Sequence, residues 1–492
     1  LPQVSKGYQR QQHPPQGCGT GRNMVENVKE IERQGLLNGD DRQSNSAGRP
    51  NEDIEDLGEI KGYWTKSARF ASDNWVPLVA NSFEWFEFAS FAYLVDPISQ
   101  NFANGNKVAV WFIFSLAFIC RPLGGIIIGL VGDKMGRKPA FWIASVTVIA
   151  STVLQGALPS SRWGGSFGQK MGLAGLLILR ITQGLGIGGE MGSGIVYLAE
   201  SSPRRFVGMT MAWLSISGGA GFLLASFFSA MLRSVLTEDE LLDWGWRLPF
   251  LVALIPGIIV LDMLSQLQET PEYEQTVEAN QVVQGSAFVP RVIALIFMCA
   301  GAAAFWYVGC VYIFDWIMAN GLKENVMWIA VLQNFCSFPA ALASGFLTDH
   351  MGLEYAFKAV LVFTALVGLP MYMITADNLN YMIVIIGPGI LFGFASGSLG
   401  VVTALLSVDL FPPILRHRSV GLGYNLSLCI FGGLGPAWVQ LAESFTNVAG
   451  AYFLLLTSLT SLLIFVTAGQ KMLKRKEFSA SRRRDNSRVL FN

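Results

Sequence analysis

Residues 129–138 read Gly-Leu-Val-Gly-Asp-Lys-Met-Gly-Arg-Lys and directly follow a long apolar segment. Residues 345–354 read Gly-Phe-Leu-Thr-Asp-His-Met-Gly-Leu-Glu and follow another one. Both stretches space two glycines around one aspartate in the same way, although Leu353 replaces the basic residue in the second. A turn of this pattern between two helices suits a hinge, because glycine permits close helix approach and the acid can meet the end of a neighbouring helix. The sequence therefore predicts two related halves, each with such a turn. The predicted conformational latch consists of Gly129, Asp133, Gly136, Arg137, Asp349 and Gly352.

The composition excludes an ordinary soluble protein. Of the 492 residues, 52% are hydrophobic and 14% are charged, whereas charged residues make up about 25% of a typical soluble domain. The charges are concentrated at the two ends of the chain. Residues 1–70 contain 10 of the 35 basic and 10 of the 35 acidic side chains, and residues 471–492 contain 8 basic and 2 acidic side chains. The body between these ends needs lipid as its solvent. It has no basic face, so we expect no binding of nucleic acid.

Twelve apolar segments in this body are long enough to cross a bilayer, which takes about 20 helical residues. They are residues 76–98, 108–130, 140–158, 171–198, 208–231, 246–266, 291–318, 326–348, 356–375, 381–407, 419–442 and 449–470. We expect an all-α integral membrane protein with twelve transmembrane helices in two pseudo-symmetric six-helix bundles. The predicted domains are a disordered cytoplasmic N-terminal tail (1–70), an N-terminal six-helix bundle (71–266), a central cytoplasmic loop (267–290), a C-terminal six-helix bundle (291–470) and a basic cytoplasmic C-terminal tail (471–492).

Lysine and arginine concentrate in the predicted loops on one side, for example at Lys134, Arg137 and Lys138. The positive-inside rule then places both termini in the cytoplasm, and we expect the plasma membrane as the location. Because the chain opens with Leu1, we expect a fragment or a processed product, and no signal peptide is visible. Five of the six cysteines lie in apolar runs without metal-like spacing, which predicts core residues and neither a disulfide framework nor a metal site.

At the latch motif the sequence resembles the major facilitator superfamily, whose loop between helices two and three carries this pattern. Other motifs resemble one branch of it, the metabolite:proton symporter family. They are Asn81-Ser-Phe-Glu84-Trp85-Phe86-Glu87-Phe88, Arg121-Pro122-Leu-Gly124-Gly125, Arg180-Ile-Thr-Gln183-Gly184, Leu410-Phe411-Pro412 and Gly423-Tyr424-Asn425. The resemblance covers the membrane region and none of the first 70 residues. It implies transport of osmolytes and organic acids such as proline, betaine, 2-oxoglutarate, citrate and shikimate with protons. That family usually has Asp where Glu87 stands, which keeps the charge.

Two arginines lie near the middle of the predicted membrane. Arg121 lies about 18 Å along its helix from Asp133, which marks the helix end at one membrane surface. Arg180 lies about 14 Å along its helix from the opposite membrane surface. A charge at this depth costs at least about 2.5–3.5 kcal/mol, so each arginine should face a polar cavity or a partner. A guanidinium binds a carboxylate bidentately and keeps its own proton. Each arginine therefore binds a substrate carboxylate or forms a structural ion pair with Glu84, Glu87 or Glu190. The predicted substrate-binding residues are Arg121, Arg180, Gln183, Tyr312 and Asn425.

A coupled proton needs a side chain that titrates within the membrane. All three histidines lie in the tail or in predicted loops, which leaves carboxylates. Burial disfavours a charged carboxylate and a nearby arginine favours it, so a glutamate that exchanges an arginine partner can take up and release a proton. We expect Glu87 to carry the proton, followed by Glu190, while Glu84 shares the helix face of Glu87. The alternative is that these acids only hold helices together.

The leading hypothesis is a secondary active transporter that couples proton symport to movement of a small organic acid or zwitterionic osmolyte by alternating access. The alternative is an uncoupled facilitative transporter of the same fold, and a transport-like receptor comes third. Residues 184–189 match the dinucleotide fingerprint but lie within a helix, so we expect helix packing there. We expect no enzyme activity, catalytic residue or cofactor. The expected partners are substrate, proton and lipid; the oligomeric state stays open, and a monomer is compatible with the sequence.

Overall fold

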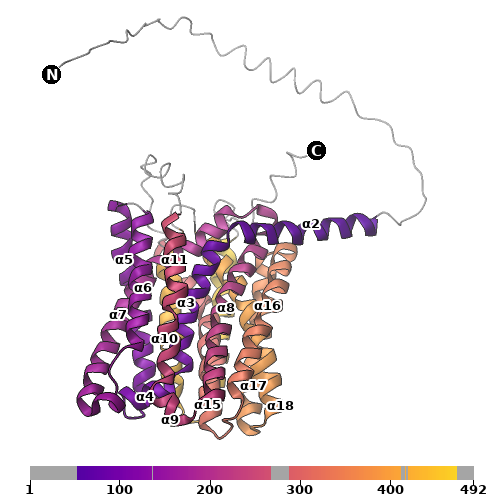
Figure 1. Ribbon diagram of the computed structural model, residues 1–492. Coiled ribbons are helices and arrows are strands. Elements are labelled where there is room, and N and C mark those ends of the chain that lie inside the picture. Colours follow the sequence, from indigo (N-terminus) through magenta and orange to yellow (C-terminus); the bar gives the residue numbers. More distant parts are fainter. Residues whose placement is uncertain (1–51, 136, 267–287, 412–415, 417–418, 474–492) are drawn as a thin grey trace, which may run out of the picture. The chain divides into compact units, whose positions relative to one another are not determined.

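The computed structural model describes residues 52–135, 137–266, 288–411, 416 and 419–473. The chain forms two compact units, Leu1–Ile60 and Lys61–Asn492. In the first unit the described residues, 52–60, are helical. All packing below belongs to the second unit, whose helices run side by side (Figure 1).

The first half of the second unit begins within α2 (Glu52–Asp73) and ends with α11. Its further helices are α3 (Trp75–Tyr93), α4 (Val95–Phe102), α5 (Lys107–Met135), α6 (Arg137–Gly156), α7 (Ser161–Ser201), η1 (Arg204–Phe206), α8 (Val207–Val235), α9 (Glu238–Asp243), η2 (Gly245–Arg247), α10 (Leu248–Val252) and α11 (Leu254–Gln266).

The second half contains several helices that change between α and the wider π form. Its elements are α13 (Phe288–Met298), α14 (Ala300–Ala304), η4 (Phe305–Tyr312), α15 (Ile313–Ala319), α16 (Val326–Met351), α17 (Leu353–Asp377), α18 (Tyr381–Val384), η5 (Ile385–Leu391), α19 (Phe392–Asp409), η6 (Val420–Tyr424), α21 (Asn425–Ser427), η7 (Leu428–Gly433), α22 (Gly435–Ala442), α23 (Ala449–Ile464), η8 (Phe465–Gly469) and α24 (Gln470–Leu473). Single π turns are frequent at functional sites, because they shift the side chains that follow them.

Each of the twelve predicted spans coincides with a helix or a run of helices, and the described residues contain no strand. Ten spans are long and apolar enough to cross a membrane by themselves. The other two are α3, which contains Glu84 and Glu87, and α6, whose apolar part is limited to Trp142–Gly156. The prediction of an all-α, twelve-helix membrane fold is confirmed.

The predicted disordered tail, residues 1–70, is wrong at its C-terminal end. Residues 1–51 lie outside the described residues, but α2 starts at Glu52 and continues to Asp73. Within it Tyr63 is buried, with its ring edge-on to Phe206 and Phe346. These rings give a polar segment enough apolar contact to hold a helix in place.

Glycines let α5 and α7 pack with their backbones in contact. A Cβ atom on Gly184 would overlap the carbonyl oxygen of Ala117, and one on Gly188 would overlap that of Arg121. The glycine run at residues 184–189 therefore packs helices, as we expected. This close contact fixes the depth at which Arg121 and Arg180 face each other.

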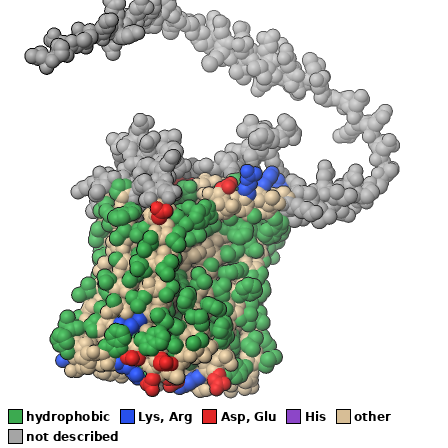
Figure 2. All heavy atoms as spheres, viewed as in Figure 1, with side chains coloured by type: hydrophobic (Ala, Val, Ile, Leu, Met, Phe, Trp, Pro, Cys, Tyr) green, Lys and Arg blue, Asp and Glu red, His purple; other side chains and the backbone are tan. Residues whose placement is uncertain are grey.

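The wall of the second unit is apolar, and its charges lie at the two ends. Figure 2 shows hydrophobic side chains over the middle of the visible face, with charged side chains toward its edges. Leu123, Ile126 and Ile255 are each exposed by more than half, as expected for side chains that face lipid. We name the end of the bundle at which α2 lies the tail face, and the end at which α4 and α9 lie the loop face (Figure 1). Asp349, which binds Tyr63 of α2, belongs to the tail face, and Lys107, which binds Asp96 of α4, belongs to the loop face.

Candidate functional site

Arg121 lies fully buried on α5 and faces α3. Its Nη2 atom is 3.9 Å from Oε1 of Glu84, which is also buried. The guanidinium carbon lies 4.5 Å from the ring centre of Phe88 and 4.4 Å from that of Phe118. One carboxylate and two aromatic rings therefore compensate this buried charge.

Arg180, on α7, is buried just as completely. It donates a 2.6 Å hydrogen bond to Oε1 of Gln183, and its guanidinium carbon is 3.6 Å from the ring centre of Phe91. Gln183 in turn donates to the hydroxyl of Thr152 at 2.8 Å. The Nε and Nη2 atoms of Arg180 have no hydrogen-bond partner among the described residues. The side chain therefore retains donors for a further acceptor.

Glu84 and Glu87 meet the two arginines from one face of α3. The carboxylate of Glu87, which is 1% exposed, attracts Arg180 electrostatically. The charges of Arg121 and Arg180 in turn repel each other, so the two guanidiniums are close. The structure thus unites four of the predicted site residues, two arginines and two glutamates, in one buried cluster.

The second half supplies tyrosines to this cluster that we did not predict. Tyr307, on η4, packs edge-on against Phe118 at 5.1 Å, and its hydroxyl has no hydrogen-bond partner among the described residues. Both Tyr307 and Tyr424 interact electrostatically with Arg121. The Gly423-Tyr424-Asn425 motif was the one sequence signal for Tyr424.

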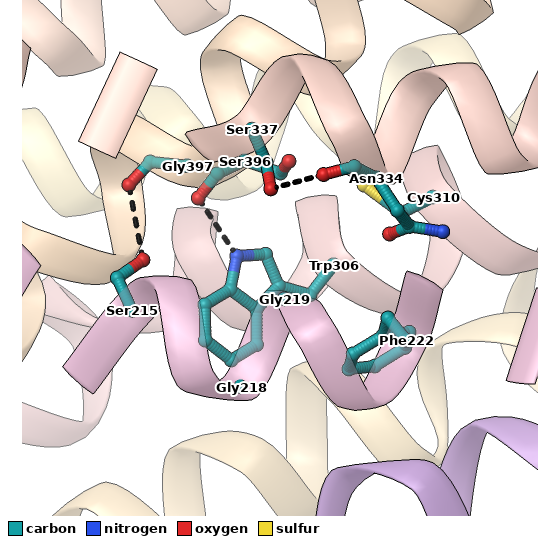
Figure 3. A pocket seen from close by; sticks show the side chains of 10 residues that line it. All are labelled: Ser215, Gly218, Gly219, Phe222, Trp306, Cys310, Asn334, Ser337, Ser396 and Gly397. Atoms are coloured by element: carbon teal, nitrogen blue, oxygen red, sulfur yellow. Dashed lines mark hydrogen bonds between the residues drawn. The ribbon is translucent and has the colours of Figure 1, made fainter. Parts of the chain in front are cut away.

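A small pocket lies between α8 of the first half and three elements of the second half (Figure 3). Its lining consists of Ser215, Gly218, Gly219 and Phe222 from α8, Trp306 and Cys310 from η4, Asn334 and Ser337 from α16, and Ser396 and Gly397 from α19. None of these ten side chains is charged. Ser215 and Ser337 donate to the carbonyls of Gly397 and Asn334. Since each hydroxyl has one proton, both can only accept a hydrogen bond from a ligand.

This pocket adjoins the charged cluster through aromatic rings. Phe222 lies 6.4 Å from both Trp306 and Tyr307, measured between ring centres. Trp85, next to Glu84 on α3, is edge-on to Trp306 at 5.2 Å. The pocket and the cluster therefore form two parts of one region between the halves.

The remaining predicted residues lie in different places. Asn425 is buried on α21 and donates to the carbonyl of Gly421 at 2.7 Å. Tyr312 lies toward the loop face, where it is hydrogen-bonded to Glu443 and its ring is 5.9 Å from that of Trp111. The side chain of Glu190 lies outside the described residues.

The second copy of the latch motif joins the two halves at the tail face. Asp349, at the end of α16, accepts hydrogen bonds from the backbone N–H groups of Gly208 and Met209 at 2.8 and 2.9 Å. Tyr63 donates a third bond to it at 2.7 Å. The carboxylate therefore caps the start of α8, where helix dipole and open N–H groups favour an anion.

Two further residues belong to this tail-face contact. Gly352 has a φ of +89°, which favours glycine after Asp349. Arg416 donates to Glu200 at 2.9 Å and so adds an ion pair between the halves. The side chains of the first copy, Asp133 and Arg137, and the positions Gly129 and Gly136 lie outside the residues whose side chains are described.

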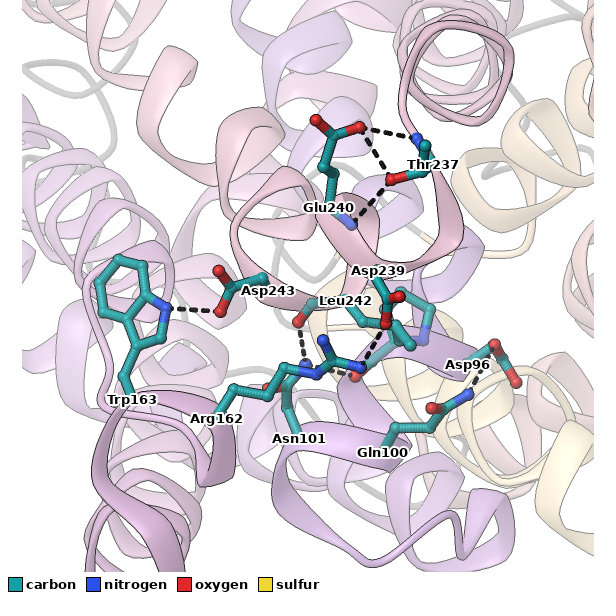
Figure 4. Close-up of polar contacts among 11 residues, drawn as sticks. Asp96, Gln100, Asn101, Arg162, Trp163, Thr237, Asp239, Glu240, Leu242 and Asp243 are labelled. Atoms are coloured by element: carbon teal, nitrogen blue, oxygen red, sulfur yellow. Dashed lines mark hydrogen bonds and ion pairs between the residues drawn. The ribbon is translucent and has the colours of Figure 1, made fainter.

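Charged residues also join the halves at the loop face. Nζ of Lys107, on α5, lies 2.7 Å from Oδ1 of Asp315 on α15 and 3.1 Å from Oδ1 of Asp96 on α4. Figure 4 shows other contacts at this face, such as that of Arg162 with Asp239 at 3.1 Å, which stay within the first half. The two halves therefore contact each other at both faces.

Residues 73–291 match the family model described as "Sugar (and other) transporter". The proline/betaine transporter of Escherichia coli (strain K12) is 28% identical over 416 residues, which cover 79% of this chain and 81% of that protein. A protein of Staphylococcus aureus (strain COL), provisionally named a proline/betaine transporter, is 29% identical over 424 residues, or 80% of this chain and 88% of that one.

Solved structures give the same fold. The proton:xylose symporter XylE, bound to 6-bromo-6-deoxy-D-glucose, aligns with a TM-score of 0.66 at 16% identity and covers 82% of this chain and 96% of its own. A structure described as a D-xylose-proton symporter aligns with a TM-score of 0.64 at 17% identity, over 84% of this chain and 98% of that one. In its fold, in the family model that it matches and in these relatives, this chain is similar to multi-pass membrane transporters of the major facilitator superfamily.

Proposed function

We propose that this protein carries a small zwitterionic osmolyte or organic acid together with a proton, by alternating access. The observation that carries the proposal is the buried pairing of Arg121 and Arg180 with Glu84 and Glu87 in the first half. Four ionisable groups in an apolar core are costly to bury. A transport cycle would account for their burial, because each arginine can exchange its glutamate for a substrate while the glutamate binds a proton.

The geometry of the first pair suits exchange of an anion. Charge-assisted bonds between a guanidinium and a carboxylate are about 2.7–2.9 Å long, whereas Arg121 and Glu84 are 3.9 Å apart. A substrate carboxylate that approaches Arg121 can replace Glu84 with a shorter, bidentate contact. A buried carboxylate that loses its cation then takes up a proton more readily. These steps link substrate binding to protonation of Glu84, and the same exchange at Arg180 would protonate Glu87, the proposed carrier.

The uncharged pocket suits the other end of a zwitterion. Its serine hydroxyls can only accept hydrogen bonds, so they favour a ligand that donates them, such as an ammonium group. The rings of Phe222 and Trp306 can attract a cation that has no N–H groups, such as a quaternary ammonium. The names of the relatives from E. coli and S. aureus, which refer to proline and betaine, support this substrate class.

We assign the tail face to the cytoplasm and the protein to the plasma membrane, on the positive-inside pattern. The predicted latch, formed by Gly129, Asp133, Gly136, Arg137, Asp349 and Gly352, would then close the cytoplasmic side. The bonds from Gly208, Met209 and Tyr63 to Asp349 support this role for the second copy. Release of these bonds would open a path from the central region to the cytoplasm.

Uptake into proteoliposomes tests the proposed function. Purified protein is reconstituted with an inward proton gradient, and uptake of radiolabelled betaine, proline, 2-oxoglutarate, citrate and shikimate is measured. We expect accumulation of betaine or proline that collapses when a protonophore is added. Uptake that equilibrates but is insensitive to the protonophore would instead establish an uncoupled facilitative transporter.

A further inference from the structure

The loop face contains a carboxylate that the proposed transport cycle does not yet use. Glu443 directly follows α22, one residue beyond the apolar span Val420–Ala442, and is half-buried. Its neighbours in the chain, Ser444 and Phe445, are exposed, so the carboxylate lies between solvent and the helix bundle. One side of it is hydrogen-bonded to Tyr312 on η4.

Several buried polar atoms in this part of the protein have no hydrogen-bond partner among the described residues. Oε1 of Glu443, Oε1 of Gln440 and the hydroxyl of Tyr372 are buried and have no hydrogen-bond partner among the described residues. The same holds for Nε1 of Trp111, whose ring packs on that of Tyr312. Buried polar atoms are rarely left without a partner, so these atoms are available to bond water or a proton-carrying group.

We propose that Glu443 is the site at which the coupled proton enters from the solution at the loop face, and that its protonation acts on the contact between the two halves. The inference rests on the proposed function, since an uncoupled transporter has no use for such a site. It adds a residue of the second half to a proton path that otherwise consists of glutamates of the first half.

The charges around Glu443 place its titration in a useful range. Burial raises the pKa of Glu443 to about 7, the hydrogen bond from Tyr312 favours the charged form and lowers it, and the negative charge of Asp315 raises it. Tyr372, on α17, also interacts electrostatically with Glu443. With a pKa of about 7, the group is charged above neutral pH and protonated below it.

A short chain of contacts links Glu443 to the first half. Glu443 acts electrostatically on Asp315, which binds Lys107 on α5 at 2.7 Å. Asp96, on α4, and Arg233, on α8, are the other charged groups that act on Asp315. Protonation of Glu443 removes a negative charge that repels Asp315, so it changes the electrostatic environment of the Lys107–Asp315 pair that joins the halves.

Titration of the full-length protein tests the site without a transported substrate. The infrared band of protonated carboxyl groups is followed from pH 5 to 9 in the parent and in Glu443→Gln, with Glu324→Gln as the control because Glu324 is an exposed carboxylate at the same face. We expect a component with a midpoint near pH 7 in the parent and in Glu324→Gln, and a smaller amplitude of this component in Glu443→Gln. An amplitude in Glu443→Gln that equals that of the parent overturns the proposal.

Two neighbouring variants keep the test decisive if Glu443→Gln folds poorly. Tyr312→Phe removes the hydrogen bond that favours the charged form, so the midpoint should move to higher pH. Asp315→Asn removes the repulsive charge, so the midpoint should move to lower pH. Equal midpoints in both variants would show that the titration near pH 7 does not come from Glu443, which would contradict the proposal.

Uptake measurements separate this inference from the proposed function. In proteoliposomes, betaine and proline uptake is measured while the pH at the loop face alone is varied. Glu443→Gln should lose the dependence on this pH that the parent has. If the parent is proton-coupled and Glu443→Gln keeps its pH profile, only the entry site is wrong. If parent uptake ignores the protonophore, the proposed coupling itself fails.

Discussion

At the scale of single residues, a cluster of two arginines and two glutamates concentrates the ionisable groups of this protein in the core of the first half. Arg121 and Arg180 are fully buried, and Glu84 and Glu87 approach them from one face of α3. In a medium of low dielectric constant, any charge that leaves its partner must be neutralised or paired again. The consequences differ for the acids and for the arginines.

Replacing Glu87 by Gln mimics its permanently protonated form. We expect Glu87→Gln to exchange internal for external substrate at a rate near that of the parent, because exchange needs no net proton movement. It should not accumulate substrate against a gradient, and its uptake should lose pH dependence. Counterflow and gradient-driven uptake of betaine or proline measure the two activities. Accumulation with the pH profile of the parent would move the proton to another residue, with Glu190 as the next to test.

Replacing Arg121 by Lys keeps the charge and removes the planar fork. Since a lysine cannot bind a carboxylate bidentately, we expect the affinity for substrate to fall by about tenfold or more. Arg162→Lys is the control, because Arg162 pairs with Asp239 at the loop face, where its side chain is partly exposed. Binding isotherms of the two purified variants provide the comparison. An unchanged Kd in Arg121→Lys would remove this side chain from the substrate site.

The sequence predicts the buried charges better than their surroundings. A charged residue within an apolar segment is costly and usually functional, which identifies Arg121, Arg180 and the two glutamates of α3 as candidates. Tyr307 does not stand out, because tyrosine is common in apolar segments and its direction depends on how η4 is rotated against α5. Tyr312, five residues further on, points to Glu443 instead of Arg121. Rotation and π turns are set by packing, which helix spacing alone does not specify.

At the scale of helices, the position of Arg121 depends on how closely α5 and α7 approach. Gly188 lies against the carbonyl oxygen of Arg121 itself. A valine there forces the backbones apart, and overpacking of this kind costs about 1–3 kcal/mol. We therefore expect Gly188→Val to lower the melting temperature of the purified protein and to weaken substrate binding.

Gly194, on the same helix, is the matched control. A Cβ atom at this position meets no atom within 4 Å, so Gly194→Val makes the same chemical change without a clash. Differential scanning fluorimetry of both variants in detergent gives the comparison. Equal melting temperatures would mean that α5 and α7 are not in backbone contact at Gly188.

The N-terminal segment illustrates what hydropathy does not detect. Residues 1–70 read as a polar tail because their apolar residues are few and scattered. Tyr63 nevertheless finds Phe206, Phe346 and the carboxylate of Asp349, all distant in sequence. A few long-range contacts stabilise this part of α2, and the local sequence pattern does not predict them.

At the scale of the whole second unit, contacts between the halves balance across its two faces. Asp349 binds the start of α8 at the tail face, and Lys107 binds Asp315 at the loop face. The internal repeat predicts the first contact, because the motif carries its aspartate. The second was not predicted, since Lys107 and Asp315 are 208 positions apart in unrelated motifs. Alternating access requires that one contact opens while the other holds.

The last prediction follows from this balance. Asp349→Asn weakens the tail-face contact and should enrich conformations open at the tail face, whereas Asp315→Asn should enrich those open at the loop face. Charge-assisted hydrogen bonds of this kind contribute about 1–3 kcal/mol, so each population ratio should change by about fivefold to 150-fold. Asp239→Asn is the control, because its partner Arg162 belongs to the same half. Distances between pairs of spin labels across each face, measured in all three variants and the parent, report the populations. Identical distance distributions in Asp349→Asn and the parent would show that the tail-face contact does not set the conformational equilibrium, and a shift of Asp315→Asn in the same direction as Asp349→Asn would refute the balance itself.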